Sequence, residues 1–596
     1  MKISREWLQT FFDAPLPEPN KLAEGLTFHA FEIESVENDI LDVKVTPNRG
    51  HDCLSHRGIG KEIGAIFDIP MTHDPFGTTP GAQFTMDASI QVSVEDPVLC
   101  PRYIAWVIKG IKVGPSPDWL KRRLEAIGER SINNIVDATN YVMFTTGQPL
   151  HAFDANHLKA PDSKPGHYAV GVRKAKSGER ISSLDGKEYT LSEKDLLIVD
   201  GKDTPVGIAG VKGGALSGIS EKTTDLLIES ANFNGVSVRK TSQSLKLRTS
   251  ASQRYEQVLS PELAAYGMRS VAALILEIAG GTLAGFSDVY PTPQQKKTVS
   301  VSLSHMRAVL GVDIEDVAVK KSFDRLGLTF TEKDGEYSVE APPERLDIAI
   351  PDDLIEEVGR IEGYEKIPPI NLSPMGKAAV VHQTFYAAEK VREEFMAAGY
   401  SEVFTSVFTE KGERVVSNKV DGVRPYLRAS LVEGLRAAFD RNMHNRDLLG
   451  LSEIKLFEIG VVWKGGEEVF MVATADKSGV SERPLPEAIS DSYDALPTST
   501  LERYQPFSKY PHISRDVALW VPKDTKSEAV HEIIKHHAGA LLVRSWKFDE
   551  FQKGDRVSYA FRLVFQSPDR TLFDGDANDR MESIYAALKK EGWEIR

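Results

Sequence analysis

The stretch DVALWVPKDTKSEAVHEIIKHHAGALLVRSWKFDEF (Asp516 to Phe551) predicts a strand, a helix and a second strand in close succession. The run RVSYAFRLVFQ that follows predicts a third strand. A helix from about Asp576 to Glu591 and a last strand at WEIR complete the unit. The order strand, helix, strand, strand, helix, strand is that of a ferredoxin-like fold. We therefore expect this fold for residues 503–596.

Loop-like segments divide the chain upstream of this unit. They are PMTHDPFGTTPGAQF (70–84), YPTPQQKK (290–297) and SERPLPEAISDSYDALPTST (481–500). The 596 residues, 41% hydrophobic and 27% charged, are enough for several separate cores. We predict an α+β protein of several domains, with units at residues 1–70, 96–280, 296–371, 380–480 and 503–596.

Targeting signals are not evident in the sequence. No run of about 18 apolar residues occurs, and the segment MKISREWLQTFFDAPLPEPN carries charges where a signal peptide has an apolar block. Cys53 and Cys100 have neither the spacing of a zinc site nor that of a disulfide framework. We therefore expect a cytoplasmic protein with no membrane partner.

Charge limits how the chain can hold a nucleic acid. Lys+Arg total 72 and Asp+Glu 86, which gives a net charge of −14, so a nucleic acid would be held only through local basic patches. One candidate, the stretch from Ser230 to Tyr255, contains no acid, and another is the predicted helix DWLKRRLEAIGER. From charge alone, a solvated surface is the alternative. The basic residues are Lys121, Arg122 and Arg123 in the helix and Arg239, Lys240, Lys246, Arg248 and Arg254 in the stretch.

Four carboxylates gather in RLDIAIPDDLIEEVGRIEGY (Arg345 to Tyr364). A helix that starts at Pro351 places Asp353, Glu356 and Glu357 on one face, and Asp347 precedes it on an extended segment. One interpretation is that Asp353 or its neighbour caps the helix and the glutamates face its positive end. The other is a hard divalent cation such as Mg²⁺, which binds carboxylate oxygens and would relieve the repulsion. Spacing does not decide between them.

Polar residues also stand out in two segments of the 96–280 unit. Thr139, Asn140 and His151 occur in DATNYVMFTTGQPLHAFD, where a structural histidine is an alternative to an acid-base group. The glycine-rich PVGIAGVKGGALSGIS lacks GK[ST] and is not a Walker loop. In TDLLIESANF, Glu229 lies at the end of an apolar strand, where it is either a buried acceptor or a reader of a ligand hydroxyl.

A family resemblance covers nearly the whole chain. The runs ATNYVMFTTGQPLHAFD, PVGIAGVKGG with LLIESANF, RLDIAIPDDLIEEVGRIEGYEKIP, and SKYPHISRDVALWV with FRLVFQSPDRTLFDGD follow one another in the family's order. Together they resemble the beta subunits of bacterial phenylalanyl-tRNA synthetases.

The resemblance implies a function for each unit. Residues 96–280 would be a B3/B4-type domain that hydrolyses tyrosine wrongly attached to tRNA(Phe), and residues 296–371 would be a winged-helix-like B5 domain. Residues 380–480 would be an inactive class II synthetase-like core, and the last unit would bind the anticodon. An alpha subunit would use ATP to attach phenylalanine, in an alpha2beta2 heterotetramer.

The resemblance also implies site residues. Glu229 would accept the tyrosine hydroxyl, and His151 with its neighbours would orient the ester and a water molecule. Mg²⁺, shared with the alpha subunit, would be bound by Asp347, Asp353, Glu356 and Glu357. The implied editing pocket consists of Thr139, Asn140, His151, Gly210, Glu229 and Ala251.

Two departures from the family pattern are visible. HAFEIESVEN passes directly to DILDVKVTPNRGHDCLS, so the oligonucleotide-binding module usual in bacterial members is missing, and NRGHDC has one residue more than the usual NRxDC. Two alternatives remain beside the editing subunit. One is a tRNA-binding scaffold that does not edit, and the other is a free-standing hydrolase of mischarged tRNA.

Overall fold

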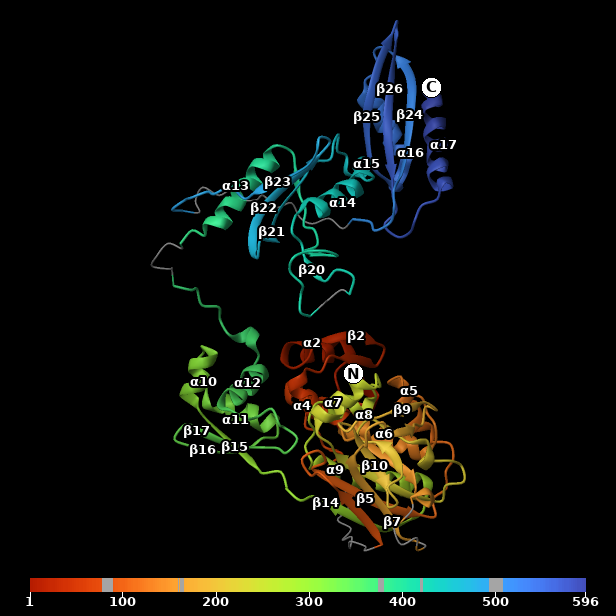
Figure 1. The fold of residues 1–596 in the computed structure, drawn as a ribbon, viewed down its shortest axis with the longest axis vertical. Coiled ribbons are helices and arrows are strands. Elements are labelled where there is room, and N and C mark those ends of the chain that lie inside the picture. Colours follow the sequence, from red (N-terminus) through yellow and green to blue (C-terminus); the bar gives the residue numbers. More distant parts are fainter. Residues whose placement is uncertain are drawn as a thin grey trace. The chain divides into compact units, whose positions relative to one another are not determined.

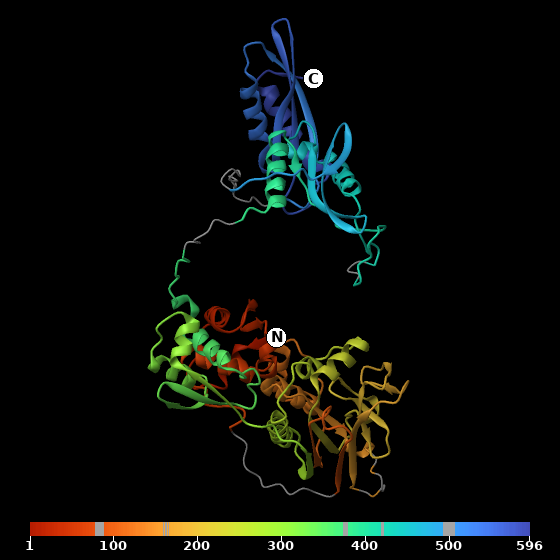
Figure 2. The same cartoon turned by 60° about the vertical axis from the view of Figure 1, so that its left-hand side comes forward.

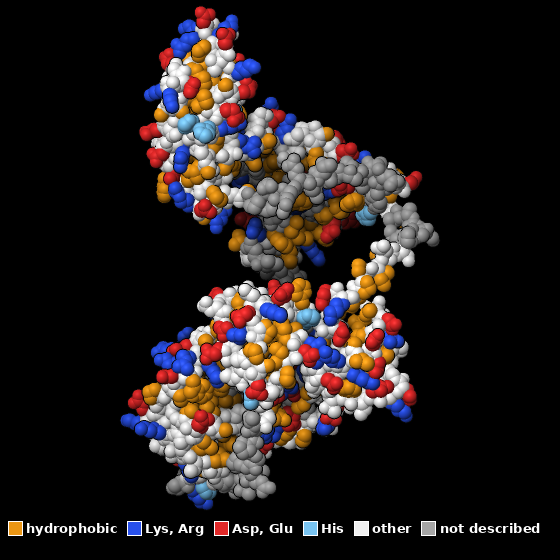
Figure 3. All heavy atoms as spheres, turned by 180° about the vertical axis from the view of Figure 1, so that it is seen from behind, with side chains coloured by type: hydrophobic (Ala, Val, Ile, Leu, Met, Phe, Trp, Pro, Cys, Tyr) orange, Lys and Arg blue, Asp and Glu red, His pale blue; other side chains and the backbone are white. Residues whose placement is uncertain are grey.

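The computed structural model describes residues 1–77, 89–158, 160, 164, 166–373, 380–418, 422–492 and 507–596. The chain forms two compact units, Met1–Asn371 and Leu372–Arg596 (Figures 1 and 2). The linkers predicted at 70–84 and 481–500 lie partly outside the described residues. Within the described ranges, no helix is long and apolar enough to span a bilayer. Acidic and basic side chains are interspersed on the surface of each unit (Figure 3).

The first 77 residues are built around a three-stranded sheet of order β1-β3-β2. Strands β2 and β3 are joined by a turn at Asn38 and Asp39, so this fully described segment has no inserted domain there, as predicted. Ser55 accepts a hydrogen bond from the Gly58 amide and starts α4. The elements are β1 (Lys2–Ser4), α1 (Arg5–Gln9), α2 (Pro19–His29), β2 (Ile33–Glu37), β3 (Ile40–Val43), η1 (Pro47–Arg49), α3 (Gly50–Cys53) and α4 (His56–Phe67).

Two sheets form the centre of the first unit, with strand orders β14-β5-β13-β6 and β12-β11-β10-β7-β4. The first contains β5 (Arg102–Lys109), β6 (Leu150–Asp154), β13 (Asp225–Asn232) and β14 (Thr282–Val289). The second contains β4 (Ile90–Val94), β7 (Tyr168–Lys174), β10 (Leu196–Asp200), β11 (Pro205–Ile208) and β12 (Lys212–Gly213), with a separate hairpin of β8 (Arg180–Ser182) and β9 (Glu188–Thr190). The helices are α5 (Asp118–Ala126), α6 (Asn134–Thr146), η2 (Ala155–His157), η3 (Ala215–Ser217), α7 (Gly235–Ser244), α8 (Ser250–Tyr255) and α9 (Leu263–Ala279).

Side-chain alternation gives the first sheet two different faces. Tyr103 and Leu227 on one face pack against Leu197 of the second sheet, in one core. Ile104 and Ile228 on the other face belong to a core shared with α6 and α9. A polar residue on the first face is therefore enclosed between two β-sheets.

A small module with strand order β15-β17-β16 completes the first unit. Its core contains Phe323, Tyr337 and Val358, all fully buried. The helix predicted to begin at Pro351 does so. The elements are β15 (Lys297–Ser302), α10 (Leu303–Leu310), α11 (Asp316–Arg325), β16 (Thr329–Lys333), β17 (Glu336–Ala341), α12 (Pro351–Glu362) and η4 (Tyr364–Lys366).

The second unit begins with a mixed sheet of order β18-β21-β22-β23. Strand β18 pairs with β21 in parallel, and the other pairings are antiparallel. Its elements do not by themselves identify a class II synthetase core, which stays a prediction. They are α13 (Gln383–Ala397), β18 (Ser401–Glu402), β19 (Phe408–Thr409), β20 (Tyr426–Leu427), α14 (Val432–Met443), α15 (Arg446–Leu449), β21 (Leu456–Lys464), β22 (Glu467–Asp476) and β23 (Gly479–Pro484).

The carboxyl-terminal module confirms the predicted ferredoxin-like order, with sheet β25-β26-β24-β27. Leu519, Phe561 and Ile584 are fully buried where the sheet meets its helices. The elements are β24 (Ile513–Pro522), α16 (Ser527–Ala538), η5 (Gly539–Leu541), β25 (Leu542–Lys553), β26 (Arg556–Phe565), α17 (Asp574–Lys590) and β27 (Glu594–Ile595).

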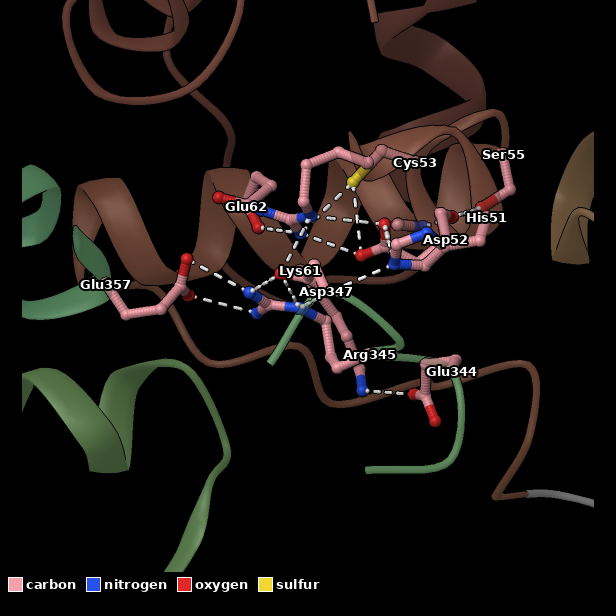
Figure 4. Close-up of polar contacts among 12 residues, drawn as sticks. His51, Asp52, Cys53, Ser55, Lys61, Glu62, Glu344, Arg345, Asp347 and Glu357 are labelled. Atoms are coloured by element: carbon pink, nitrogen blue, oxygen red, sulfur yellow. Dashed lines mark hydrogen bonds and ion pairs between the residues drawn. The ribbon is translucent and has the colours of Figure 1, made fainter. Parts of the chain in front are cut away.

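A buried chain of ion pairs joins α4 to α12 within the first unit (Figure 4). Arg49 donates to Glu62 over 2.6 Å, and Arg360 donates to the other oxygen of Glu62 over 2.6 Å. Arg360 also donates to Glu357 over 2.7 Å, and Glu357 accepts from Arg345 over 3.0 Å. Carboxylates and guanidinium groups therefore alternate along the chain.

Arginines decide the ionisation of this buried chain. Burial alone would raise the pKa of Glu62, but Arg360 and Arg49 more than offset it and hold the pKa below its usual value. The same balance, with Arg345 and Arg360, lowers the pKa of Glu357 strongly. Both glutamates are therefore ionised at neutral pH, and each depends on a guanidinium partner.

Replacing Arg360 by Met should destabilise the first unit. The change leaves Glu62 and Glu357 buried with one cation fewer each, which costs about 3 kcal/mol of unfolding free energy or more. Lys296→Met, which breaks the exposed pair with Glu340, should cost at most about 1 kcal/mol. Urea unfolding followed by circular dichroism measures both, and equal effects would contradict the role given to Arg360.

Candidate functional site

A cavity of about 210 Å³ lies between the two central sheets. The first sheet contributes His151 and Glu229, and the second contributes Ile198, Ile208 and the β12 backbone. Helices α6 and α8 supply the remaining walls. The cavity therefore has a mixed lining of apolar and polar groups, with His151 and Glu229 directed into it.

Five of the six predicted pocket residues line this one cavity. They come from separate elements: Asn140, His151, Gly210, Glu229 and Ala251. Thr139 does not line it, and its hydroxyl donates to the Val136 carbonyl over 2.7 Å inside α6. The structure therefore groups the other five and leaves Thr139 with a helix-internal role.

Strand pairing brings Glu229 and His151 together. Glu229 in β13 lies directly opposite His151 in β6 and Ala105 in β5. The placement of Glu229 at a strand end was wrong, because it lies within the paired strand β13. Residues directly opposite on an antiparallel pair project from the same face, so both side chains point between the sheets.

Glu229 is a buried carboxylate with a single hydrogen-bond donor. Its Oε2 accepts from the Tyr103 hydroxyl over 2.7 Å, and its Oε1 accepts no hydrogen bond from any described residue. Burial raises the pKa of Glu229 to about 7, although the hydrogen bond from Tyr103 works in the opposite direction. The carboxyl group therefore changes charge near neutral pH.

His151 is enclosed and neutral. Burial lowers its pKa to about 4, and its Nε2 is a buried atom without a hydrogen-bond partner among the described residues. A Cβ on Gly213 would come within 2.4 Å of the His151 ring, so only glycine fits there. At neutral pH the ring is thus uncharged, and its Nε2 is enclosed by protein atoms, with Gly213 packed against it.

Gly210 lies between the cavity and the core residues behind it. Its φ of +70° favours glycine, and a Cβ there would lie 2.8 Å from Val238 and 3.1 Å from Tyr255. The missing side chain therefore makes room for core residues, and the backbone lines the cavity.

Sequence reasoning missed Tyr103, which donates to Glu229 behind the cavity wall. It also missed Lys212 and Tyr255, which line the cavity. The Tyr255 hydroxyl donates to the Ala231 carbonyl over 2.9 Å. The Lys212 amine lies 3.6 Å from Asp185. Tyr103 follows the pattern of an ordinary core aromatic on an apolar strand, so no local signal distinguished it.

The four predicted Mg²⁺ ligands have different surroundings within the chain. Asp353 accepts from the amides of Ala349 and Ile350 over 2.7 and 2.8 Å, which is the capping role of the alternative interpretation. Asp347 and Glu357 accept from Arg345, and Glu356 is exposed outside the ion-pair chain. In the part of the chain that is described, no three His, Cys, Asp or Glu residues form a metal-binding group.

The cations of the basic stretch are exposed, except for the last one. Arg254 is buried and donates to the carbonyls of Leu54 and Ser250, so it is not part of the basic surface. None of the other four cations has an ion pair with a described residue. The next residues, Thr249 to Ala251, line the cavity. The exposed cations are Arg239, Lys240, Lys246 and Arg248.

Three family models match the chain. The model of the B3/4 domain matches residues 99–280, which contain the cavity, and that of the tRNA synthetase B5 domain matches 299–364. The model of the ferredoxin-fold anticodon binding domain matches 508–596. Together these modules are those of the aminoacyl-tRNA synthetase class.

Two relatives narrow the class to a family. Proteins of Halalkalibacterium halodurans and Moorella thermoacetica, each called phenylalanine–tRNA ligase beta subunit, are 32% identical over 94% of this chain and 80% of their own length. A fragment of the phenylalanyl-tRNA synthetase beta-subunit from Pyrococcus horikoshii has a TM-score of 0.36 and 15% identity, over 61% of this chain and 99% of that one. On the strength of the two relatives, the chain belongs to the phenylalanine–tRNA ligase beta-subunit family.

Replacing Glu229 by Gln should stabilise the protein at high pH only. The folded-state pKa of about 7 exceeds the usual 4.5, so the wild type loses stability as pH rises from about 4.5 through 7. Gln does not titrate, and the variant should be more stable by up to about 3 kcal/mol at pH 8 and by little at pH 5. Urea midpoints at both pH values test this, and a pH-independent difference would contradict it.

Proposed function

We propose that this chain is an editing beta subunit that hydrolyses tyrosine ester wrongly attached to tRNA(Phe) in the cavity between the two sheets. An alpha-subunit partner attaches phenylalanine to the tRNA with ATP. The observation that carries the proposal is that Oε1 of Glu229, which accepts no hydrogen bond from a described residue, lies in a cavity with both apolar and polar walls. A ring side chain with a hydroxyl group fits such a site better than one without.

Selectivity follows from the cost of leaving Glu229 unpaired. A tyrosine hydroxyl donates to Oε1, whereas a phenylalanine ring displaces water and leaves the carboxylate without that partner. Sites that hydrogen-bond a substrate hydroxyl discriminate strongly against analogues that lack it. The cavity therefore prefers the wrong amino acid, as an editing site requires.

Hydrolysis is assigned to a water molecule, without a covalent intermediate. The cavity includes Thr249 and Ser250, but the Thr249 hydroxyl donates to the Val211 carbonyl, and the described contacts include no hydrogen bond from Ser250 to a base. The neutral His151, which lines the cavity, is assigned as the group that accepts a proton from this water, while Asn140 supplies an amide to orient the ester.

The partners follow from family membership. The ferredoxin-fold module and the B5 module support contact with tRNA and with the rest of a synthetase. The alpha2beta2 assembly and the inactive class II-like core in residues 380–480 are part of the proposal. Mg²⁺ stays a prediction from the resemblance, and no step here depends on it.

Deacylation by the chain co-expressed with its alpha partner tests the proposal. Glu229→Ala should reduce the preference for Tyr-tRNA(Phe) over Phe-tRNA(Phe) by about tenfold or more, and His151→Ala should slow tyrosine release by about 100-fold. Glu193→Ala, which changes an exposed glutamate of the same domain, serves as the control. A complex that charges phenylalanine but releases no tyrosine would identify the chain as a scaffold that does not edit.

The basic surface beside the cavity should bind the acceptor end of the tRNA. Lys246→Gln with Arg248→Gln should raise the KM for Tyr-tRNA(Phe), and should lower the slope of log KM against log salt by about 0.7 for each phosphate that no longer binds a cation. Lys297→Gln with Lys333→Gln removes two equally exposed, unpaired cations from another module. Equal salt slopes in the two double variants would contradict the assignment.

A further inference from the structure

Tyr103 is the only described residue that donates a hydrogen bond to the Glu229 carboxylate. It lies in β5, two residues from Ala105, which pairs with Glu229, so both side chains project from the same face of the sheet. Both are buried, Tyr103 completely and Glu229 with 5% of its surface exposed. The hydrogen bond of 2.7 Å therefore forms in a region of low dielectric, where it is strong.

Among the described residues, no cation pairs with the Glu229 carboxylate. The ionisable groups near it are Cys100 and Tyr103 on the β5 side, His151 on β6 and Tyr255 on α8. Cys100, Tyr103 and Tyr255 have pKa values well above their usual ranges because of burial, and His151 is neutral, so none carries a positive charge at neutral pH. Lys212 lines the same cavity and pairs with Asp185.

A single donor has two consequences for the carboxylate. Tyr103 occupies Oε2, which fixes the rotation of the carboxylate plane and leaves Oε1 as the oxygen available to the cavity. The donated proton also favours the ionised form over the protonated one. A phenol hydroxyl in the cavity then meets a fixed, charged acceptor.

We propose that Tyr103 is a positioning residue for selectivity: through its hydrogen bond to Oε2, it holds Oε1 of Glu229 as an ionised acceptor for the hydroxyl group of a tyrosyl ester. The inference rests on the proposed editing function. Tyr103 then contributes to the discrimination between the tyrosine and phenylalanine side chains through Glu229, without touching the substrate.

Tyr103→Phe removes the donor and keeps the ring. In the chain co-expressed with its alpha partner, the preference for Tyr-tRNA(Phe) over Phe-tRNA(Phe) should fall by about tenfold, mainly through slower tyrosine release. Tyr337→Phe is the matched control, because the Tyr337 hydroxyl also donates to a carboxylate, Asp316, in another module. Its preference should equal that of the wild type. An unchanged preference in Tyr103→Phe would overturn the inference.

The pH profile separates positioning from a general structural role. In the wild type the preference should rise as pH increases through about 7, as Glu229 ionises. In Tyr103→Phe the midpoint should move to higher pH, because the hydrogen bond that lowers the Glu229 pKa is lost. An unshifted midpoint would contradict the inference.

A double-mutant cycle covers the case in which Tyr103→Phe weakens the fold. In a Glu229→Gln background, Tyr103→Phe should change the preference no further. An equal fold-change in both backgrounds would show that Tyr103 does not act through Glu229. If the wild-type complex releases no tyrosine at any pH, the proposed function fails, whereas normal tyrosine release with unchanged selectivity in Tyr103→Phe rejects this inference alone.

Discussion

The candidate site depends on the antiparallel pairing of β13 with β5 and β6, which holds Glu229 between two sheets. Backbone hydrogen bonds fix this register, and a shift of one residue would turn the carboxylate to the opposite face, against α6 and α9. The same register places His151 opposite Glu229 and Tyr103 within hydrogen-bond distance. The proposed selectivity, the burial of the histidine and the position of the cavity all depend on this pairing.

The chain contains buried carboxylates of two kinds. Glu62 and Glu357 bind arginines, which keep the pKa of each below its usual value, and they connect two modules of the first unit. Glu229 has one neutral donor, and burial raises its pKa to about 7. The difference is the presence of guanidinium groups. Fully paired carboxylates serve as structural links, whereas the carboxylate with a free oxygen is available to a ligand.

Local sequence patterns predicted the features of the fold that depend on interactions between residues close in the sequence. The ferredoxin-like order followed from strand and helix patterns, and the start of α12 followed from Pro351 and Asp352. The family resemblance, and not the spacing, selected Glu229 and His151, which the structure places in one cavity. Long-range partners were not visible. Arg360 lies 298 residues from Glu62 in the sequence, and Arg49 lies 13 residues from it. No local pattern relates either arginine to Glu62.

Some residues with ordinary local patterns have special surroundings in the fold. Arg254 belongs to a basic run but is buried against Leu54 and Ser250, and Thr139 lies beside a cavity residue but bonds within its helix. Tyr103 has the pattern of a core residue but donates to the carboxylate of the site. The role of each of these residues is set by its hydrogen-bond partners in the fold. The local sequence pattern does not show which partners those are.

The most direct test of the account is calorimetric binding of two non-hydrolysable ligands, the tyrosyl and phenylalanyl amides of the 3′-terminal adenosine, at pH 6 and pH 8. The account predicts that the tyrosyl compound binds about tenfold or more tightly at pH 8, and that the difference narrows at pH 6 as Glu229 becomes protonated. Equal affinities at both pH values would contradict the claim that Glu229 recognises the hydroxyl group.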